Sequence, residues 1–163
     1  MIQAGSRVST LAITRTKAES TDAKAVDEAN NQQFKTFAGT QTVGSAFYEF
    51  AEEFWNVVNA CSSRNWDGFG ATGLSSDTVY TAWRVGQVIP FGLFRPSVGA
   101  EPDGQITLEW HVAPRRTLSV SVDGAGNLHY AALLGSDRKA FGTESFVGVV
   151  PDRILDLIYS IIA

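Results

Sequence analysis

Three segments in the second half of the chain, residues 106–111, 117–122 and 128–134, alternate between apolar and polar residues. Successive side chains of a strand point to opposite faces of a sheet, so this period of two predicts three strands with one apolar face each. The turn DGAGN at residues 123–127 is rich in residues that accept positive φ, which favours a tight hairpin. The apolar face is predicted to consist of Ile106, Leu108, Trp110, Leu118, Val120, Val122, Leu128, Tyr130, Ala132 and Leu134.

Three other segments carry the period of an amphipathic helix. Between Ser45 and Cys61, apolar residues recur at i, i+3, i+4 and i+7, which places them on one helical face. Residues 75–77, Ser-Ser-Asp, supply the capping chemistry for a second helix that ends at Pro90. Pro151 begins a third segment with a broad apolar stripe, so the sequence predicts a C-terminal helix.

The remaining segments complete an α+β fold. The prolines and glycines between residues 91 and 104 indicate a connection with one short extended piece around residues 96–98. For residues 136–150 the sequence predicts a loop and a short edge strand. An antiparallel meander with one apolar face needs a cover, which the helices can provide. We therefore predict a two-layer α+β fold, in which a meander of three to five strands is covered on one face by amphipathic helices and followed by a C-terminal helix.

The first part of the chain differs in composition from the rest. Residues 1–43 are rich in Thr, Ala, Ser and Gln, with scattered charges and few large apolar side chains that would hold them against a core. We predict that residues 1–43 form a polar, mobile or peripheral N-terminal arm. Residues 44–163 are then a single α+β domain, long enough to bury a core without a disulfide or a metal.

Charge limits the kinds of partner that we expect. The net charge is −4 and the pI is about 5.1, with the acidic excess in residues 44–110. Nucleic-acid-binding proteins rely on Lys and Arg to displace counterions, so we expect no direct binding of nucleic acid. Glu49, Glu52 and Glu53 lie on the polar side of the first helix, where they are candidates for binding another protein with a basic surface.

Cysteine usage and hydropathy favour a cytoplasmic protein without membrane association. Cys61 is the only cysteine, so no intrachain disulfide is possible and a reducing compartment is the simpler interpretation. No apolar run has the length of a signal-peptide core or of a bilayer span. Cys61 has no neighbouring His or basic cluster, so we interpret it as a small buried residue rather than a nucleophile.

The run NWDGFGA, residues 65–71, concentrates unusual residues between the first two helices. Its glycines permit backbone angles closed to other residues, Trp66 and Phe69 can fold back between the helices, and Asp67 can accept hydrogen bonds from the amides of the turn. This structural interpretation needs no substrate, and we favour it. Trp66, Asp67 and Phe69 are also the candidate ligand-binding residues of this loop.

An enzymatic interpretation pairs Asp67 with Glu109. Two carboxylates flanking a cleft, with aromatic rings for stacking, are the arrangement of a glycoside hydrolase. The period of two, however, places Glu109 on the face away from Trp110, so the two carboxylates are not expected to converge. The chain also lacks a phosphate loop, a dinucleotide fingerprint, a nucleophile elbow and an HExxH pair. We therefore favour a protein without catalytic residues.

A metal site is the other chemical possibility. His111 and His129 lie on different predicted strands, both on the outward face, where Glu109 would be a third ligand. Three scattered ligands without a local motif are typical of a polar strand surface rather than of a metal site. We expect neither a metal nor a cofactor.

The motif order resembles that of a protein family. NWDGFGA, the later run PDGQITLEW and the strand LSVSV together resemble a broad group of uncharacterised bacterial proteins with an N-W-D-G-aromatic-G-A loop and a later L-E-W strand. The resemblance covers about residues 64–135. It implies a bacterial or mobile-element setting and brings no assigned activity.

Three functional hypotheses follow. The first is a non-enzymatic binding or inhibitory protein of the immunity, antitoxin or anti-defence kind, which would act through its acidic residues, the edge of an open meander and its polar arm. The second is a small-molecule or carbohydrate binder or hydrolase with a site near the NWDGFGA loop. The third is an oligomerisation module that uses a sheet edge or the last helix.

Overall fold

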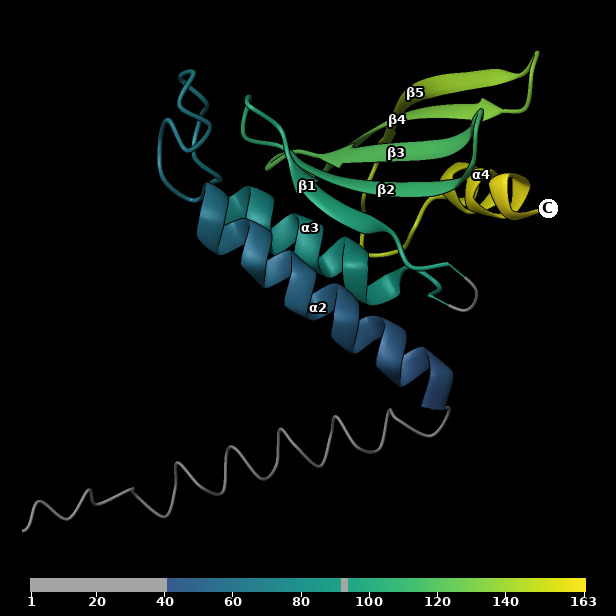
Figure 1. Cartoon of the computed structure of the whole chain (residues 1–163), viewed down its shortest axis with the longest axis horizontal. Helices are drawn as coiled ribbons and strands as arrows, with labels where there is room; N and C mark the ends of the chain where they lie inside the picture. The colour runs from purple at the N-terminus through teal and green to yellow at the C-terminus, as the bar shows by residue number, and fades with distance from the viewer. Residues whose placement is uncertain (1–40, 92–93) are drawn as a thin grey trace, which may run out of the picture. The chain divides into compact units, whose positions relative to one another are not determined.

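The computed structural model describes residues 41–91 and 94–163 of the chain, which contain three helices and a five-stranded sheet (Figure 1). The helices are α2 (Gln41–Cys61), α3 (Ser76–Val88) and α4 (Asp152–Ile162), and the strands are β1 (Ser97–Ala100), β2 (Ile106–Ala113), β3 (Arg116–Val122), β4 (Asn127–Leu134) and β5 (Lys139–Ser145). The strands lie in chain order, and each is antiparallel to its neighbour. The predicted α+β class, with a meander and a C-terminal helix, is confirmed.

One face of the sheet is buried and the other is open, as the period of two predicts. Ile106, Leu118 and Leu128, from three adjacent strands, are each 0% exposed. α4 packs across β2, β3 and β4, and α3 packs on β2 and β3, so both helices cover this buried face. The apolar stripe of α4 buries Ile154, Leu157, Ile158 and Ile161. The result is a layer of helices on a sheet whose other face carries Ser, Thr, His and Glu.

Aromatic rings join α2 to α3. Phe50 and Phe54 of α2 are fully buried, and the centroid of Phe54 lies 5.2 Å from that of Trp83 on α3. The Phe50 ring also packs against Phe91, with 5.0 Å between centroids. Gly86 of α3 faces the Phe50 ring so closely that a Cβ atom at this position would overlap it. The absence of a side chain at Gly86 is therefore what lets the ring pack against the helix.

The ends of α3 follow the predicted signals. Ser75 is the N-cap, and its Oγ accepts a hydrogen bond of 3.1 Å from the Thr78 amide. Val88 is the last helical residue, and the extended backbone of Ile89 leads into Pro90. Thr78, Ala82, Val85 and Gly86 are the buried residues of this helix.

The predicted arm at residues 1–43 lies almost entirely outside the described residues. Residues 41–43 are the first three residues of α2, so this helix begins four residues before the predicted start at Ser45. The division of the chain at residue 44 otherwise stays a prediction.

We expect Gly86→Ala to lower the free energy of unfolding. In an exposed helix this change gains about 1 kcal/mol, but the overlap with the fully buried Phe50 ring forces the packed cluster apart, which costs about 1–3 kcal/mol. Urea denaturation measures the difference. Gln87→Ala, at an exposed neighbouring position of α3, is the control and should change stability by less than about 0.5 kcal/mol. Equal stability of the two variants would mean that the ring has room to move.

Candidate functional site

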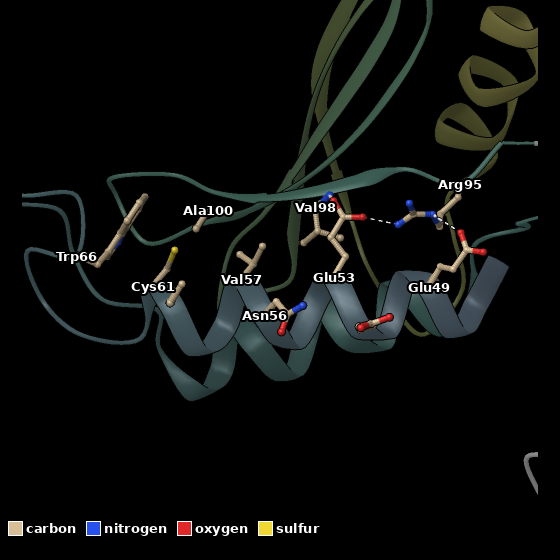
Figure 2. Close-up of a pocket in the computed structure, with 11 residues that line it drawn as sticks. Glu49, Glu53, Asn56, Val57, Cys61, Trp66, Arg95, Val98 and Ala100 are labelled. Atoms are coloured by element: carbon tan, nitrogen blue, oxygen red, sulfur yellow. Dashed lines mark hydrogen bonds and ion pairs between the residues drawn. The ribbon is translucent and has the colours of Figure 1, made fainter. Parts of the chain in front are cut away.

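A groove of about 610 Å³ lies between α2 and the edge strand β1 (Figure 2). α2 forms one wall, the segment from Arg95 through β1 forms the other, and the loop after α2 contributes Trp66. Four of the six residues predicted to bind a partner line this groove, namely Glu49, Glu52, Glu53 and Trp66. Asp67 and Phe69 do not line it. The groove is therefore the place where the structure brings predicted binding residues together.

One end of the groove is charged. The Arg95 guanidinium forms an ion pair with Glu53, and its Nε lies 3.6 Å from Glu49 (Figure 2). The other Glu53 oxygen accepts a hydrogen bond of 2.9 Å from the Val98 amide, which lies on the free edge of β1. Glu53 thus ties α2 to β1, and both of its carboxylate oxygens already have partners within the chain. Glu52 is exposed to solvent.

The other end of the groove is apolar. Trp66 is half-buried, and its Nε1 donates to the Thr72 carbonyl oxygen over 3.2 Å, which fixes the orientation of the ring. Cys61 is 8% exposed, and burial raises the pKa of its thiol. A raised pKa keeps the sulfur protonated and unreactive near neutral pH. With Val57 and Ala100, these side chains form a surface that suits an apolar group.

The NWDGFGA loop is held by its own main chain. Asp67 Oδ1 accepts hydrogen bonds from the amides of Phe69 (2.8 Å) and Ala71 (3.0 Å), as the sequence predicted. Asn65 adopts a positive φ of 62°, and its Oδ1 accepts from the Gly70 amide over 2.7 Å. The Phe69 and Ala71 amides lower the pKa of Asp67 below its usual value of 3.8, because they stabilise the charged form and outweigh the effect of burial.

Phe69 overturns part of the prediction for this loop. The sequence allowed the ring to fold back between the helices, but Phe69 is 95% exposed. The amides that donate hydrogen bonds to Asp67 belong to the main chain of this loop tip. They fix the geometry of the tip without burial of the Phe69 side chain. Trp66, three residues earlier in the loop, packs against the core.

The candidate catalytic and metal-binding residues stay apart. Glu109 lies on the open face of β2, directly opposite Ser119 of β3, and among the described residues no hydrogen bond joins it to Asp67. His111 and His129 lie on the same open face, where each Nδ1 is 2.9 Å from a threonine hydroxyl. Among residues 41–91 and 94–163, no group of three or more His, Cys, Asp or Glu is placed to hold a metal ion.

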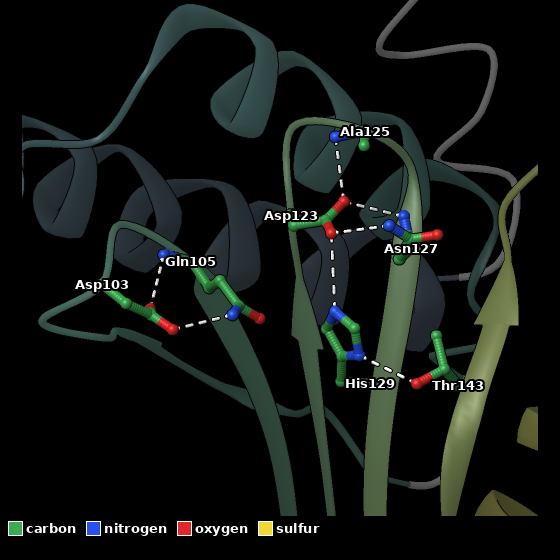
Figure 3. Close-up of polar contacts among 7 residues, drawn as sticks. All are labelled: Asp103, Gln105, Asp123, Ala125, Asn127, His129 and Thr143. Atoms are coloured by element: carbon green, nitrogen blue, oxygen red, sulfur yellow. Dashed lines mark hydrogen bonds and ion pairs between the residues drawn. The ribbon is translucent and has the colours of Figure 1, made fainter.

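The His129 contacts place a carboxylate, an imidazole and a hydroxyl in sequence (Figure 3). Asp123 Oδ2 lies 3.4 Å from His129 Nε2, and His129 Nδ1 lies 2.9 Å from Thr143 Oγ1. The Asp123 carboxylate, however, also accepts from the Ala125 and Asn127 amides, both at 2.9 Å, so it closes the β3–β4 turn. Burial alone raises the pKa of Asp123, but the hydrogen bonds from Asn127, Ala125 and His129 outweigh it and lower the pKa. These contacts fit a structural role in the hairpin.

A smaller hollow of about 370 Å³ lies between α3 and the β3–β4 turn. Tyr80 and Arg84 line it from α3, Gly124 and Gly126 from the turn, and Phe146 from the segment after β5. Arg84 donates to the Tyr80 hydroxyl over 3.1 Å. This hollow contains none of the residues that the sequence predicted for binding.

Arg95 is the residue of the groove that the sequence analysis missed. It stands in the connection before β1, and its partner Glu53 lies 42 residues earlier in the chain. The available signal was a lone cation next to Pro96 in an otherwise uncharged segment. Nothing in that local pattern indicates which carboxylate it would meet.

Comparisons with known proteins identify no relative. No family model, no curated protein and no solved structure matches the chain. The resemblance drawn from the NWDGFGA and LEW motifs therefore stays a prediction. Within the described residues, none of the helices has the length and apolar character needed to cross a bilayer.

We expect Asp67→Ala to lower the melting temperature by several degrees at neutral pH, because two amides of the loop lose their acceptor. Since the folded-state pKa of Asp67 lies below 3.8, its contribution to stability is complete above that pH and is lost as the pH falls through the lower value. The gap between wild type and variant should therefore shrink below about pH 4.

Thermal melts across a pH series measure this gap. Asp137→Ala, which removes an exposed carboxylate in the β4–β5 turn, is the matched control and should melt like the wild type at every pH. A constant gap for Asp67→Ala down to the most acidic buffer would contradict the assigned role of the carboxylate.

Proposed function

We propose that this chain is a non-enzymatic binding protein that holds a basic segment of another protein in the groove between α2 and β1. In this proposal the chain acts as an inhibitor of the immunity, antitoxin or anti-defence kind, because a bound segment is withheld from its own function. The observation that carries the proposal is the groove itself, in which a charged end and an apolar end lie side by side.

The charge of the groove supports a basic ligand. Glu49, Glu52 and Glu53 line the groove together with a single guanidinium, that of Arg95, which pairs with Glu49 and Glu53, so negative charge is in excess at this end. The exposed Glu52 carboxylate is available to a Lys or Arg side chain from outside. Charges at the rim of an interface act mainly on the rate of association and on the choice of partner. An excess of carboxylates therefore favours a cationic segment over an acidic one.

The apolar end of the groove favours a ligand that carries an apolar side chain at a defined distance from its own Lys or Arg. Along α2, Glu53 and Cys61 are about 12 Å apart, since a helix rises about 1.5 Å per residue. An extended peptide covers this distance in about four residues. We therefore propose a segment with Lys or Arg at one position and a large apolar residue about four positions away, packed against the oriented Trp66 ring.

Labelled short peptides with Lys and Leu four positions apart test the proposal by fluorescence anisotropy. We expect them to bind, and we expect peptides with Glu in place of Lys not to bind. Glu52→Lys should weaken binding about tenfold, which corresponds to about 1.4 kcal/mol, because it replaces attraction with repulsion. Added salt should also weaken binding, since the contact is exposed.

Glu109→Lys is the matched control for this experiment. It makes the same change of charge at an exposed carboxylate, but on the open face of β2 and outside the groove. We expect it to leave the affinity almost unchanged. Equal losses in Glu52→Lys and Glu109→Lys would show that binding reflects net charge alone, and equal binding of the Lys and Glu peptides would overturn the proposal.

A further inference from the structure

The two edges of the sheet differ in how they are covered. α2 packs along β1, and Glu53 accepts the hydrogen bond of the Val98 amide on that edge. At the other edge, α4 packs on β2, β3 and β4, and β5 forms the margin of the sheet in Figure 1. No helix in the described part of the chain packs along the outer edge of β5. Within residues 41–91 and 94–163, no helix occupies the main-chain groups on that edge, which can therefore pair with another strand.

The register of β4 and β5 fixes which main-chain groups point outward. The Leu134 amide donates to Arg138, and the Phe146 amide donates to Gly126, so the residues of β5 at even positions face β4. In an antiparallel pair, hydrogen bonding alternates along the strand. Lys139, Phe141, Thr143 and Ser145 consequently direct their N–H and C=O groups away from the sheet.

β5 also lacks most of the features that keep an edge strand from pairing. Its register with β4 is continuous, without a bulge, and it contains no proline. Lys139, at one end, is its single basic residue. Phe141, in its middle, points to the open face and is 84% exposed. An exposed aromatic ring on an unprotected edge is typical of a surface that another strand covers.

We propose that a second copy of this chain covers this edge, with β5 antiparallel to β5 about a two-fold axis at Phe141. In this register each Phe141 lies opposite Phe141 of the other copy, and the two rings contact each other on the open face. Arg138 of one copy lies opposite Glu144 of the other, and the symmetry makes this ion pair twice. Lys139 lies opposite Thr143.

The neighbouring registers are less complementary. An axis at Gly142 places Arg138 opposite Phe146, and Ala140 opposite Glu144, which removes both ion pairs. An axis at Ala140 places Phe141 opposite Lys139, which separates the two aromatic rings. The register centred on Phe141 is the one that combines the aromatic pair with matched charges. It also joins the two sheets into one, with a groove between α2 and β1 at each far end.

Light scattering tests the dimer. We expect wild type to have twice the monomer mass of 17.6 kDa and Phe141→Lys to have the monomer mass, because two like charges would meet on the axis. Phe141→Glu alone should also be monomeric, and an equal mixture of the Lys and Glu variants should recover the double mass. A monomeric wild type at every concentration, or a Phe141→Lys variant that stays dimeric, would overturn the proposal.

Cysteine pairs test the register in a Cys61→Ser background. Lys139→Cys with Thr143→Cys should form a disulfide-linked dimer under mild oxidation, because opposite residues of a hydrogen-bonded pair lie about 5.5 Å apart, within the range for a disulfide. Each single variant should stay unlinked, because identical positions would be roughly 13 Å apart. If both single variants formed a disulfide-linked dimer as fast as the double variant, the proposed register would be wrong. Peptide binding by the groove is a separate readout, so failure of one proposal leaves the other standing.

Discussion

Burial of a single face of the sheet is the constraint on which the rest of this structure depends. The alternate residues of β2, β3 and β4 form one continuous apolar surface, and Leu108, Val120 and Leu128 are removed from solvent. Helices with an apolar stripe can cover such a surface, and α3 and α4 do so here. The same alternation leaves the other face to polar side chains, which is why Glu109, His111 and His129 all lie there.

The helices cover the two edges of the sheet differently, since α2 packs along β1 and no described helix packs along β5. The groove beside β1 and the outer edge of β5 both result from this difference. α2 reaches the β1 edge, where Glu53 and Arg95 hold helix and strand together and leave a groove beside them. No described helix packs along β5, so its main-chain groups and Phe141 remain on the surface. One edge of the sheet is thus suited to a ligand and the other to a second sheet. A dimer through β5 would present two grooves to one partner, which raises the effective affinity when both can be reached.

The corner between α2 and α3 supports the groove through its own hydrogen bonds. Asp67 is occupied by the amides of its own turn, so the carboxylate stabilises a fixed loop shape. That shape holds Trp66 against the core at the apolar end of the groove. The same hydrogen bonds keep the tip in place with the Phe69 ring in solvent. A rigid loop with an exposed ring gives a partner a contact that needs little ordering on binding.

The sequence by itself determined the features that arise from neighbouring residues. The periods of the strands and helices, the cap at Ser75 and the acceptor role of Asp67 each depend on contacts within a few positions, so local patterns predict them. Tertiary structure alone decided that Glu53 meets Arg95, that Phe69 is exposed and that Glu49, Glu52 and Trp66 border one groove. The ion pair and the groove depend on how α2 lies against β1, which brings together residues about forty positions apart. The type of a residue shows whether it can form an ion pair or be buried as a ring. Which partner it meets is decided by the packing of the whole domain.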